Sequence, residues 1–317
     1  MKPVSPEIFY NHCYGKYAIA AVNVFTMEQV HGLFAAAQES DTPVIVQITP
    51  AARNYAHPKM IMAMISAAGN IYPKAVYAIH MDHGVEDHID DALIDNYTSV
   101  MIDASHDDFE TNIKRTKSVV QKAQAKNIVV EAELGVLSGV EDDLNIDESK
   151  SFYTDPNQAK EFVEKTGCNS LAVAVGTSHG AYKFNGGKGL QFDVLQKIQN
   201  ELPHYPLVLH GSSSVNKDVI SAINQYGGKL NENASGVTDE EIKKAVSYGI
   251  CKVNIATDLR LLWTKVHRQF FHEQPQLFDP VIPGKEYMKA YKEFLTERFE
   301  VLGSKGKASS IKLTTCD

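Results

Sequence analysis

The feature that most constrains the fold of this chain is a regular alternation of short β-branched runs with longer amphipathic stretches. Eight runs are predicted to be strands: residues 18–24, 43–49, 75–82, 99–103, 128–133, 170–179, 207–210 and 251–254. Helical periodicity separates them, most clearly over residues 27–40, 108–126, 157–166 and 239–248. Strands that alternate with helices indicate βαβ units and a parallel sheet. Eight such strands within about 255 residues match a (β/α)8 TIM barrel.

A doubly wound open sheet is the competing architecture. It usually carries a glycine-rich turn after its first strand, whereas residues 21–26 read AVNVFT and contain no glycine. We therefore predict an α/β protein whose residues 1–317 form a single TIM-barrel domain. A C-terminal helical extension is expected over about 279–317, with a helix from Lys285 to Leu302.

Two segments interrupt the alternation. Residues 138–156 are acidic and polar, so we expect a long surface loop of the kind that often forms a lid. Residues 180–190 are glycine-rich and follow a strand, which predicts a second segment able to move. Residues 226–237 resemble an insertion in the seventh βα unit.

Charge and cysteine usage exclude several classes of partner. The net charge of −8 argues against a nucleic-acid partner, although a local site for a small anion remains compatible with it. The longest apolar runs are far too short to span a bilayer, and the N-terminus lacks the apolar core of a secretory signal. The four cysteines form no CxxC pair, which argues against a cysteine-based zinc site or a redox pair. We expect a cytoplasmic protein with no membrane partner.

Polar side chains stand at the carboxyl end of every predicted strand, where TIM barrels carry their chemistry. In chain order they are Asn23, Gln47 and Thr49, Asp82 and His83, Asp103, Glu131 and Glu133, His179, His210, and Asn254. Three of these are histidines that each precede a glycine: His83, His179 and His210. Neutral imidazoles that converge from different strands are typical of a catalytic Zn²⁺ site. A single such histidine is more often a hydrogen-bonded structural residue, so the prediction depends on the set.

The carboxylates admit two interpretations. Asp82 could act as a general acid/base beside a metal-bound substrate, or could fix the tautomer of a histidine. Glu131 and Glu133 are two residues apart and therefore point to the same side of their strand. They and Asp103 could face a cation, or could form ion pairs with lysines of neighbouring strands.

The segments HGSSS (210–214) and NIAT (254–257) suggest an anion site. Small residues let backbone N–H groups approach a phosphate, and TIM barrels often bind phosphate after strands seven and eight. The alternative is helix capping, which Ser and Thr do well. The histidines nearby favour phosphate.

Taken together, these segments resemble the class II, metal-dependent fructose-1,6-bisphosphate aldolases, a family that also holds tagatose-bisphosphate aldolases. The resemblance runs from about Ile19 to Gly303. Its motifs are AIHMDHG (78–84), SVMIDASH (99–106), VVEAELG (129–135), GTSHGAY (176–182), LVLHGSSS (207–214) and KVNIATD (252–258). The resemblance implies reversible cleavage of fructose 1,6-bisphosphate into dihydroxyacetone phosphate and glyceraldehyde 3-phosphate, with tagatose 1,6-bisphosphate as the alternative substrate.

The resemblance also implies roles for individual residues. His83, His179 and His210 match zinc ligands, and Glu133 and Asp103 match carboxylates that can bind an alternative or second divalent ion. Asp82 matches the acid/base at the C4 hydroxyl, and Glu141 a mobile-loop glutamate that assists proton transfer. Triose-phosphate contacts are implied for Gly180, Gly211, Ser213, Asn254 and Thr257, with Na⁺ or K⁺ near Gly180 and Gly211. Asn23, Gln47 and Thr49 match substrate-side positions. Lys183, Lys285 and Arg298 are candidates for the distal phosphate. A homodimer or homotetramer is implied.

The sequence departs from the family pattern at three places. Thr49 replaces a common Ser, the usual GGSG or GGTG turn reads Gly211-Ser212-Ser213-Ser214, and Ala256 replaces an Asp or Asn. Three competing functions remain: a zinc-dependent TIM-barrel hydrolase, a Schiff-base aldolase, and a non-catalytic metal-binding or scaffold protein. No lysine is predicted at a strand end, since Lys252 is expected to begin its strand.

Overall fold

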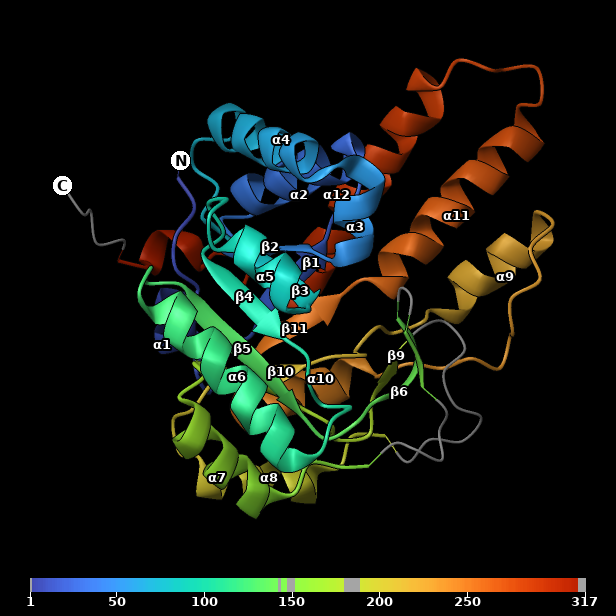
Figure 1. The fold of residues 1–317 in the computed structure, drawn as a ribbon. Coiled ribbons are helices and arrows are strands. Elements are labelled where there is room, and N and C mark those ends of the chain that lie inside the picture. The colour runs from blue at the N-terminus through green and yellow to red at the C-terminus, as the bar shows by residue number, and fades with distance from the viewer. Residues whose placement is uncertain (1, 142–143, 147–151, 180–188, 313–317) are drawn as a thin grey trace.

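A computed structural model describes residues 2–141, 144–146, 152–179 and 189–312. Eight parallel strands close into a barrel in the order β1-β11-β10-β8-β5-β4-β3-β2 (Figure 1). The strands are β1 (Ile19–Asn23), β2 (Val44–Ile48), β3 (Tyr77–Gly84), β4 (Ser99–Ile102), β5 (Val129–Leu134), β8 (Ser170–Val173), β10 (Leu207–Leu209) and β11 (Ile250–Ile255). The predicted TIM barrel is confirmed, and each strand lies within one of the predicted runs or extends it by one or two residues.

Helices surround the barrel. They are α1 (Glu7–Cys13), α2 (Met27–Glu39), α3 (Pro50–Ala56), α4 (Pro58–Ile71), α5 (Glu86–Ala92), α6 (Phe109–Gln124), α7 (Pro156–Thr166), α8 (Phe192–Glu201), α9 (Lys217–Gln225), α10 (Asp239–Val246), α11 (Thr257–Glu273) and α12 (Val281–Val301), with a short 3₁₀ turn, η2 (Ala308–Ser310). Several begin at a side-chain cap: Asp108 accepts from Thr111 N at α6, and Asp155 accepts from Asn157 N and Gln158 N at α7. None of the helices in the described ranges is long and apolar enough to cross a membrane.

Strand alternation divides the interior into two cores. Outward residues such as Val22, Val46 and Val130 are buried against the helices in the larger apolar cluster. Inward residues near the strand starts, including Ile19, Ile45 and Val129, form a second cluster. Helix α1 contributes its own residues to that second cluster and so closes the barrel floor. The inward positions farther along the strands are polar, and they form the site described below.

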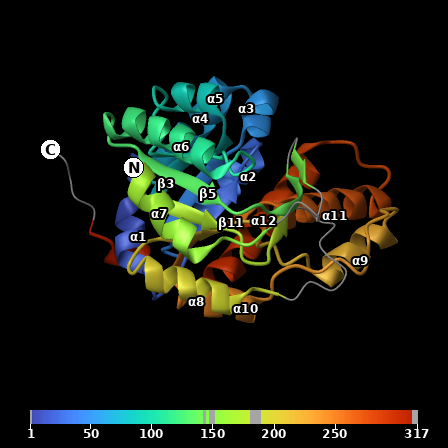
Figure 2. The ribbon, with the colours of Figure 1, turned by 60° about the horizontal axis from the view of Figure 1, so that its bottom comes forward.

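The C-terminal extension is anchored by α12, which packs on α2 and α11. At Gly32 of α2, an added Cβ would lie 2.9 Å from Tyr291 Cδ1, so the two helices approach closely because residue 32 has no side chain. Helix α12 begins at Val281, four residues before the predicted start. Part of α11 and the start of α12 project beyond the barrel (Figures 1 and 2).

The prediction of a long loop over residues 138–156 is wrong for residues 138–141 and 144–146, whereas residues 153–155 have no regular secondary structure. Ser138–Glu141 form β6 and Leu144–Ile146 form β7, and the two pair in antiparallel fashion. The predicted strand over 170–179 divides, because residues 178–179 leave the barrel as β9 (Ser178–His179) and pair with β6. A small three-stranded sheet therefore stands beside the barrel mouth (Figure 1).

Candidate active site

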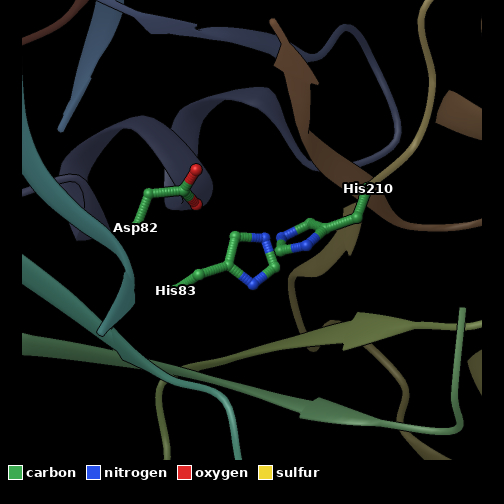
Figure 3. Close-up of side chains that lie close together, drawn as sticks. All are labelled: Asp82, His83 and His210. Atoms are coloured by element: carbon green, nitrogen blue, oxygen red, sulfur yellow. The ribbon is translucent and has the colours of Figure 1, made fainter. Parts of the chain in front are cut away.

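A bulge at the end of β3 brings two consecutive residues into the barrel mouth. Successive strand residues normally point to opposite faces. Here the register between β3 and β4 shifts between Met81 and Gly84, and His83 has a φ of 47°, in the left-handed region. The shift turns His83 so that its ring and the Asp82 carboxylate share one space with His210 (Figure 3). Bulges commonly re-aim a side chain beside an active site.

Amide side chains surround the Asp82 carboxylate, which is fully buried. Asn23 Nδ2 and Gln47 Nε2 each donate to Asp82 Oδ2 at 3.2 Å, and Asn254 Nδ2 lies 3.4 Å from Oδ1. Gln47 Nε2 also donates to Asn23 Oδ1 at 2.9 Å. The three amides come from β1, β2 and β11 and hold the carboxylate in place through N–H donors. Asn23 and Gln47, predicted to contact substrate, contact Asp82 here.

His83 is oriented by Asp103. Its Nδ1 lies 3.2 Å from Asp103 Oδ2, and Asp103 Oδ1 accepts from the backbone N and the Oγ of Ser105 at 3.1 and 2.8 Å. Burial alone would raise the pKa of Asp103, but the His83 ring and the Ser105 donors lower it well below its usual value. Asp103 therefore stays ionised and fixes the second nitrogen of His83 toward the mouth.

His210 lies between two carboxylates of β5. Its Nε2 is 2.9 Å from Glu131 Oε1, and its Nδ1 is 3.4 Å from Glu133 Oε2. The ring also meets that of His83 edge to face, at 4.8 Å between centroids. Burial lowers the pKa of His210, so the folded chain favours the neutral imidazole that a metal requires. As predicted from their spacing, Glu131 and Glu133 point to the same side.

An ion pair lies beneath these residues. Lys252 Nζ is 2.8 Å from Glu131 Oε2 and 3.0 Å from Oε1, and all three atoms belong to buried side chains. Lys252 is the third residue of β11, so the expectation that it begins its strand is wrong. Because Asn254 faces the mouth, Lys252 two residues earlier must also face inward, and the alternation of the strand contained this signal. Burial lowers the pKa of His80, whose Nε2 lies 3.4 Å from Lys252 Nζ.

The donor set fits a divalent metal ion. Ligand atoms of Asp82, His83 and His210 lie within 4.8 Å of one another, as do those of His83, Asp103 and Glu133. Imidazole nitrogens with carboxylate oxygens suit Zn²⁺ and neighbouring transition metals. His179, the third predicted ligand, lies in β9. An added Cβ at Gly211 would be 2.6 Å from Ser178 O, so the chain beside His179 packs closely against the residue that follows His210.

The segment after β10 is held in place by Asp258, which sequence reasoning missed. Asp258 Oδ2 accepts from Ser214 N at 2.8 Å, and Oδ1 accepts from Val215 N at 2.9 Å. The Ser212 hydroxyl donates to Asn254 O at 2.8 Å, which ties the ends of β10 and β11 together. Ser213 is buried in the same turn. The only signal for Asp258 was its position in the first turn of a helix.

The remaining predicted residues are placed as follows. Thr49 accepts from Ala52 N and caps α3, and Thr257 is the first residue of α11. Glu141 is the last residue of β6. Gly180 and Lys183 lie outside the described residues. Arg298, a candidate for the distal phosphate, donates to Asp239 Oδ1 at 2.6 Å instead, and Lys285 lies near the start of α12.

Comparison with known proteins agrees with this arrangement. The family described as "Fructose-bisphosphate aldolase class-II" matches residues 6–307. The chain is 41% identical over 299 residues to a fructose-bisphosphate aldolase of Thermus caldophilus, covering 92% of this chain and 95% of that protein. It is 40% identical over 307 residues to a fructose-bisphosphate aldolase of Giardia intestinalis, with 95% and 93% covered.

Among solved structures, the crystal structure of the YdjI aldolase from Escherichia coli K12 superposes with a TM-score of 0.76 at 32% identity, covering 97% of this chain and 100% of that one. The family match covers most of the chain, and the motif residues gather at one barrel mouth. Together these findings assign the chain to a family. The chain belongs to the class-II fructose-bisphosphate aldolase family, whose members are lyases.

Proposed function

We propose that this chain catalyses the metal-dependent, reversible cleavage of fructose 1,6-bisphosphate to dihydroxyacetone phosphate and glyceraldehyde 3-phosphate. The observation that carries the proposal is the bulge at the end of β3, which presents the Asp82 carboxylate and the His83 imidazole to one space together with His210. Relatives named fructose-bisphosphate aldolase at about 40% identity support the choice of substrate.

Asp82 would transfer the proton. In cleavage, its carboxylate accepts the proton of the C4 hydroxyl while the C3–C4 bond breaks, and in condensation it returns that proton to the new alkoxide. The amides of Asn23, Gln47 and Asn254 hold the carboxylate in place for both directions. We assign Glu141, at the end of β6, as a second group that assists proton transfer.

His83, His179 and His210 would hold a divalent ion, most simply Zn²⁺. Such an ion supplies Lewis acidity that polarises the ketone oxygen and stabilises the charge of the enediolate. Asp103 and Glu133 would hold an alternative or second divalent ion, since each lies beside one of these histidines. Gly180, Gly211, Ser213, Asn254 and Thr257 would bind the triose phosphate, with Na⁺ or K⁺ near Gly180 and Gly211, and Lys183 is proposed for the distal phosphate.

The Schiff-base alternative requires a lysine with a free amine at the substrate. Lys252 lies buried beneath the site, and its ammonium group is held by both oxygens of Glu131. A lysine whose amine is held by a carboxylate on both oxygens is not free to attack a carbonyl carbon. The arrangement therefore supports metal chemistry over imine chemistry.

We further propose a homodimer or homotetramer in the cytoplasm. Large apolar side chains are exposed on the projecting part of α11 and α12 and on the connection between them: Trp263, Phe271, Phe278 and Val281. Apolar surface of this kind is typical of a protein contact, and a second copy of the chain would cover it. Light scattering on the purified protein should give at least twice the mass of one chain, whereas a monomer would refute the proposal.

The decisive test of the activity is cleavage of fructose 1,6-bisphosphate in a triose-coupled assay. Activity should disappear after chelation and return with Zn²⁺. Tagatose 1,6-bisphosphate assayed in parallel establishes the C4 preference. Cleavage by protein shown to be metal-free, or no cleavage of either bisphosphate by metal-loaded protein, would contradict the proposal. The latter result would favour the zinc hydrolase or scaffold alternatives.

A further inference from the structure

We propose that Glu131 and Lys252 are positioning residues that fix which nitrogen of His210 faces the barrel mouth. The inference rests on the proposed function, because it treats His210 as a metal ligand. The proposed aldol cleavage uses neither Glu131 nor Lys252, and both side chains are at most 1% exposed.

The hydrogen bonds define the tautomer of His210. Glu131 Oε1 is a carboxylate oxygen and can only accept, so His210 Nε2 at 2.9 Å must carry the hydrogen. In a neutral imidazole the lone pair is then on Nδ1. That atom lies 3.4 Å from Glu133 Oε2. At this separation, His210 Nδ1 and Glu133 Oε2 are close enough for both to coordinate one cation.

Lys252 holds the Glu131 carboxylate in the orientation that faces His210. This ion pair fixes the direction in which the Glu131 oxygens point. The Lys252 ammonium contacts both oxygens of Glu131, so the pair is neutral as a whole and adds no net charge beneath the metal position. His80 holds the other side of Lys252: its Nε2 is 3.4 Å from Nζ, and its Nδ1 is 2.7 Å from Ser99 Oγ.

Stability does not explain this pair. The neighbouring inward positions below it are apolar, for example Ile19 and Val129. Replacing a buried ion pair by apolar residues of similar volume is often neutral or stabilising, because desolvation of the charges offsets their attraction. A buried ion pair that contacts a proposed metal-binding histidine is better explained by a need to orient that histidine.

The test compares two double variants, Lys252→Met with Glu131→Gln and Lys252→Met with Glu131→Leu. Both remove the two charges, so neither leaves an unpaired buried charge. The glutamine side chain can still accept from His210 Nε2, whereas the leucine side chain cannot. We expect the leucine variant to bind Zn²⁺ about 10- to 100-fold more weakly than the glutamine variant in chelator competition, as for loss of other hydrogen bonds to metal-binding histidines. The visible spectrum of bound Co²⁺ should also change in the leucine variant.

Equal Zn²⁺ affinities with identical Co²⁺ spectra would overturn the inference. Arg53→Met is a control, because Arg53 is a buried residue whose ion pair, with Asp91, includes none of the proposed metal ligands. It should lower the stability without weakening Zn²⁺ binding. Circular dichroism checks that each variant is folded.

A second measurement needs no variant. In metal-free wild-type protein labelled with ¹⁵N-histidine, two-bond ¹H–¹⁵N correlations report the tautomer of His210. Hydrogen on Nε2 is expected, and hydrogen on Nδ1 would overturn the inference. Failure of the proposed function is distinguishable, because a wild-type chain that binds no divalent ion would still report its His210 tautomer.

Discussion

At the scale of single residues, the geometry of the candidate site depends on backbone strain at His83. A φ of 47° is unfavourable for a residue with a Cβ, and it persists where the surroundings enforce it. Gly84 follows, and an added Cβ there would lie 3.1 Å from Ile89 Cγ1 and 3.3 Å from Met101 O. The chain therefore passes close to β4 just after the bulge, which fixes both Asp82 and His83.

Asp82→Asn should lower kcat by roughly 10²- to 10⁴-fold, because an amide cannot accept the hydroxyl proton. The bound Zn²⁺ should remain at the wild-type stoichiometry, since the histidines are unchanged. Asp90→Asn is a matched control, because Asp90 is an exposed carboxylate paired with Lys122. Steady-state kinetics measures kcat, and metal analysis measures the bound Zn²⁺, for both variants. Near-normal turnover of the Asp82 variant would exclude it as the acid/base.

At the scale of elements, contacts between distant segments shape the barrel mouth. Asp258, in the first turn of α11, binds the backbone N–H groups of Ser214 and Val215. Val215 is β-branched and has a φ of 50°, which costs energy unless neighbouring groups enforce it. The turn after β10 is thus held by the helix that follows β11, and its shape is not a property of its own sequence.

Asp258→Ala should lower the free energy of unfolding by about 1–3 kcal/mol, because it leaves buried N–H donors without an acceptor. It should also raise KM for the bisphosphate more than it lowers kcat, since the turn contributes proposed phosphate contacts. Asp155→Ala is the control: it removes the cap of α7 and should destabilise by about 1 kcal/mol with KM unchanged. Denaturant titration and kinetics on both variants decide between positioning and general loss of stability.

Gly32→Ala should destabilise the contact between α2 and α12 by about 1–3 kcal/mol, because its Cβ would overlap the Tyr291 ring. Gly284→Ala, in α12 itself, is the matched control. Its Cβ would make only an ordinary contact with Glu28 at 3.6 Å, so better helix propensity should leave stability unchanged or raise it by up to about 1 kcal/mol. The unfolding temperature should fall for Gly32→Ala and stay unchanged or rise for Gly284→Ala, and equal falls in both variants would contradict the close approach.

At the scale of the whole molecule, buried groups make stability depend on pH. Burial lowers the pKa of His80 and His210 below their ordinary 6.5, so the folded chain keeps them neutral. On the surface, hydrogen bonds from Arg115 lower the pKa of Glu86 from 4.5 to about 2. In both cases the unfolded chain binds protons more readily than the folded chain does, so a falling pH favours unfolding.

The free energy of unfolding of the metal-free protein should therefore fall as the pH drops below 6.5, and fall further between 4.5 and 2 as Glu86 and other paired carboxylates lose their charge. The stabilisation from Glu86 is present above pH 4.5 and is lost as the pH falls through its folded pKa. Glu86→Gln should flatten only the second decline, and slightly, since this pair is at the surface. Denaturant titrations at a series of pH values measure both declines. A free energy of unfolding that rises as the pH falls would contradict the roles given to these groups.

The sequence by itself determined the barrel and most of the site. Eight apolar runs with helices between them allow few folds, and parallel strands deliver their carboxyl ends to one mouth. Strand alternation is a local property, so it could place inward polar pairs such as Glu131 with Glu133 there, whereas His83 joins Asp82 only through the bulge at the end of β3. The same alternation places the Lys252 side chain inside the barrel, although Lys252 was expected to be at the beginning of its strand.

Only the tertiary structure decided how those residues pair. Whether Asn23 and Gln47 face substrate or Asp82, and whether Glu131 faces a lysine, depends on strands that are distant in sequence and meet across the barrel. The acidic segment was predicted to be a loop because its strands β6 and β7 are short and polar. Strand β6 pairs not only with β7 but also with β9, a segment more than 30 residues away in the sequence. Hydrogen-bond partners of this kind are long-range, and composition or periodicity within one segment carries no record of them.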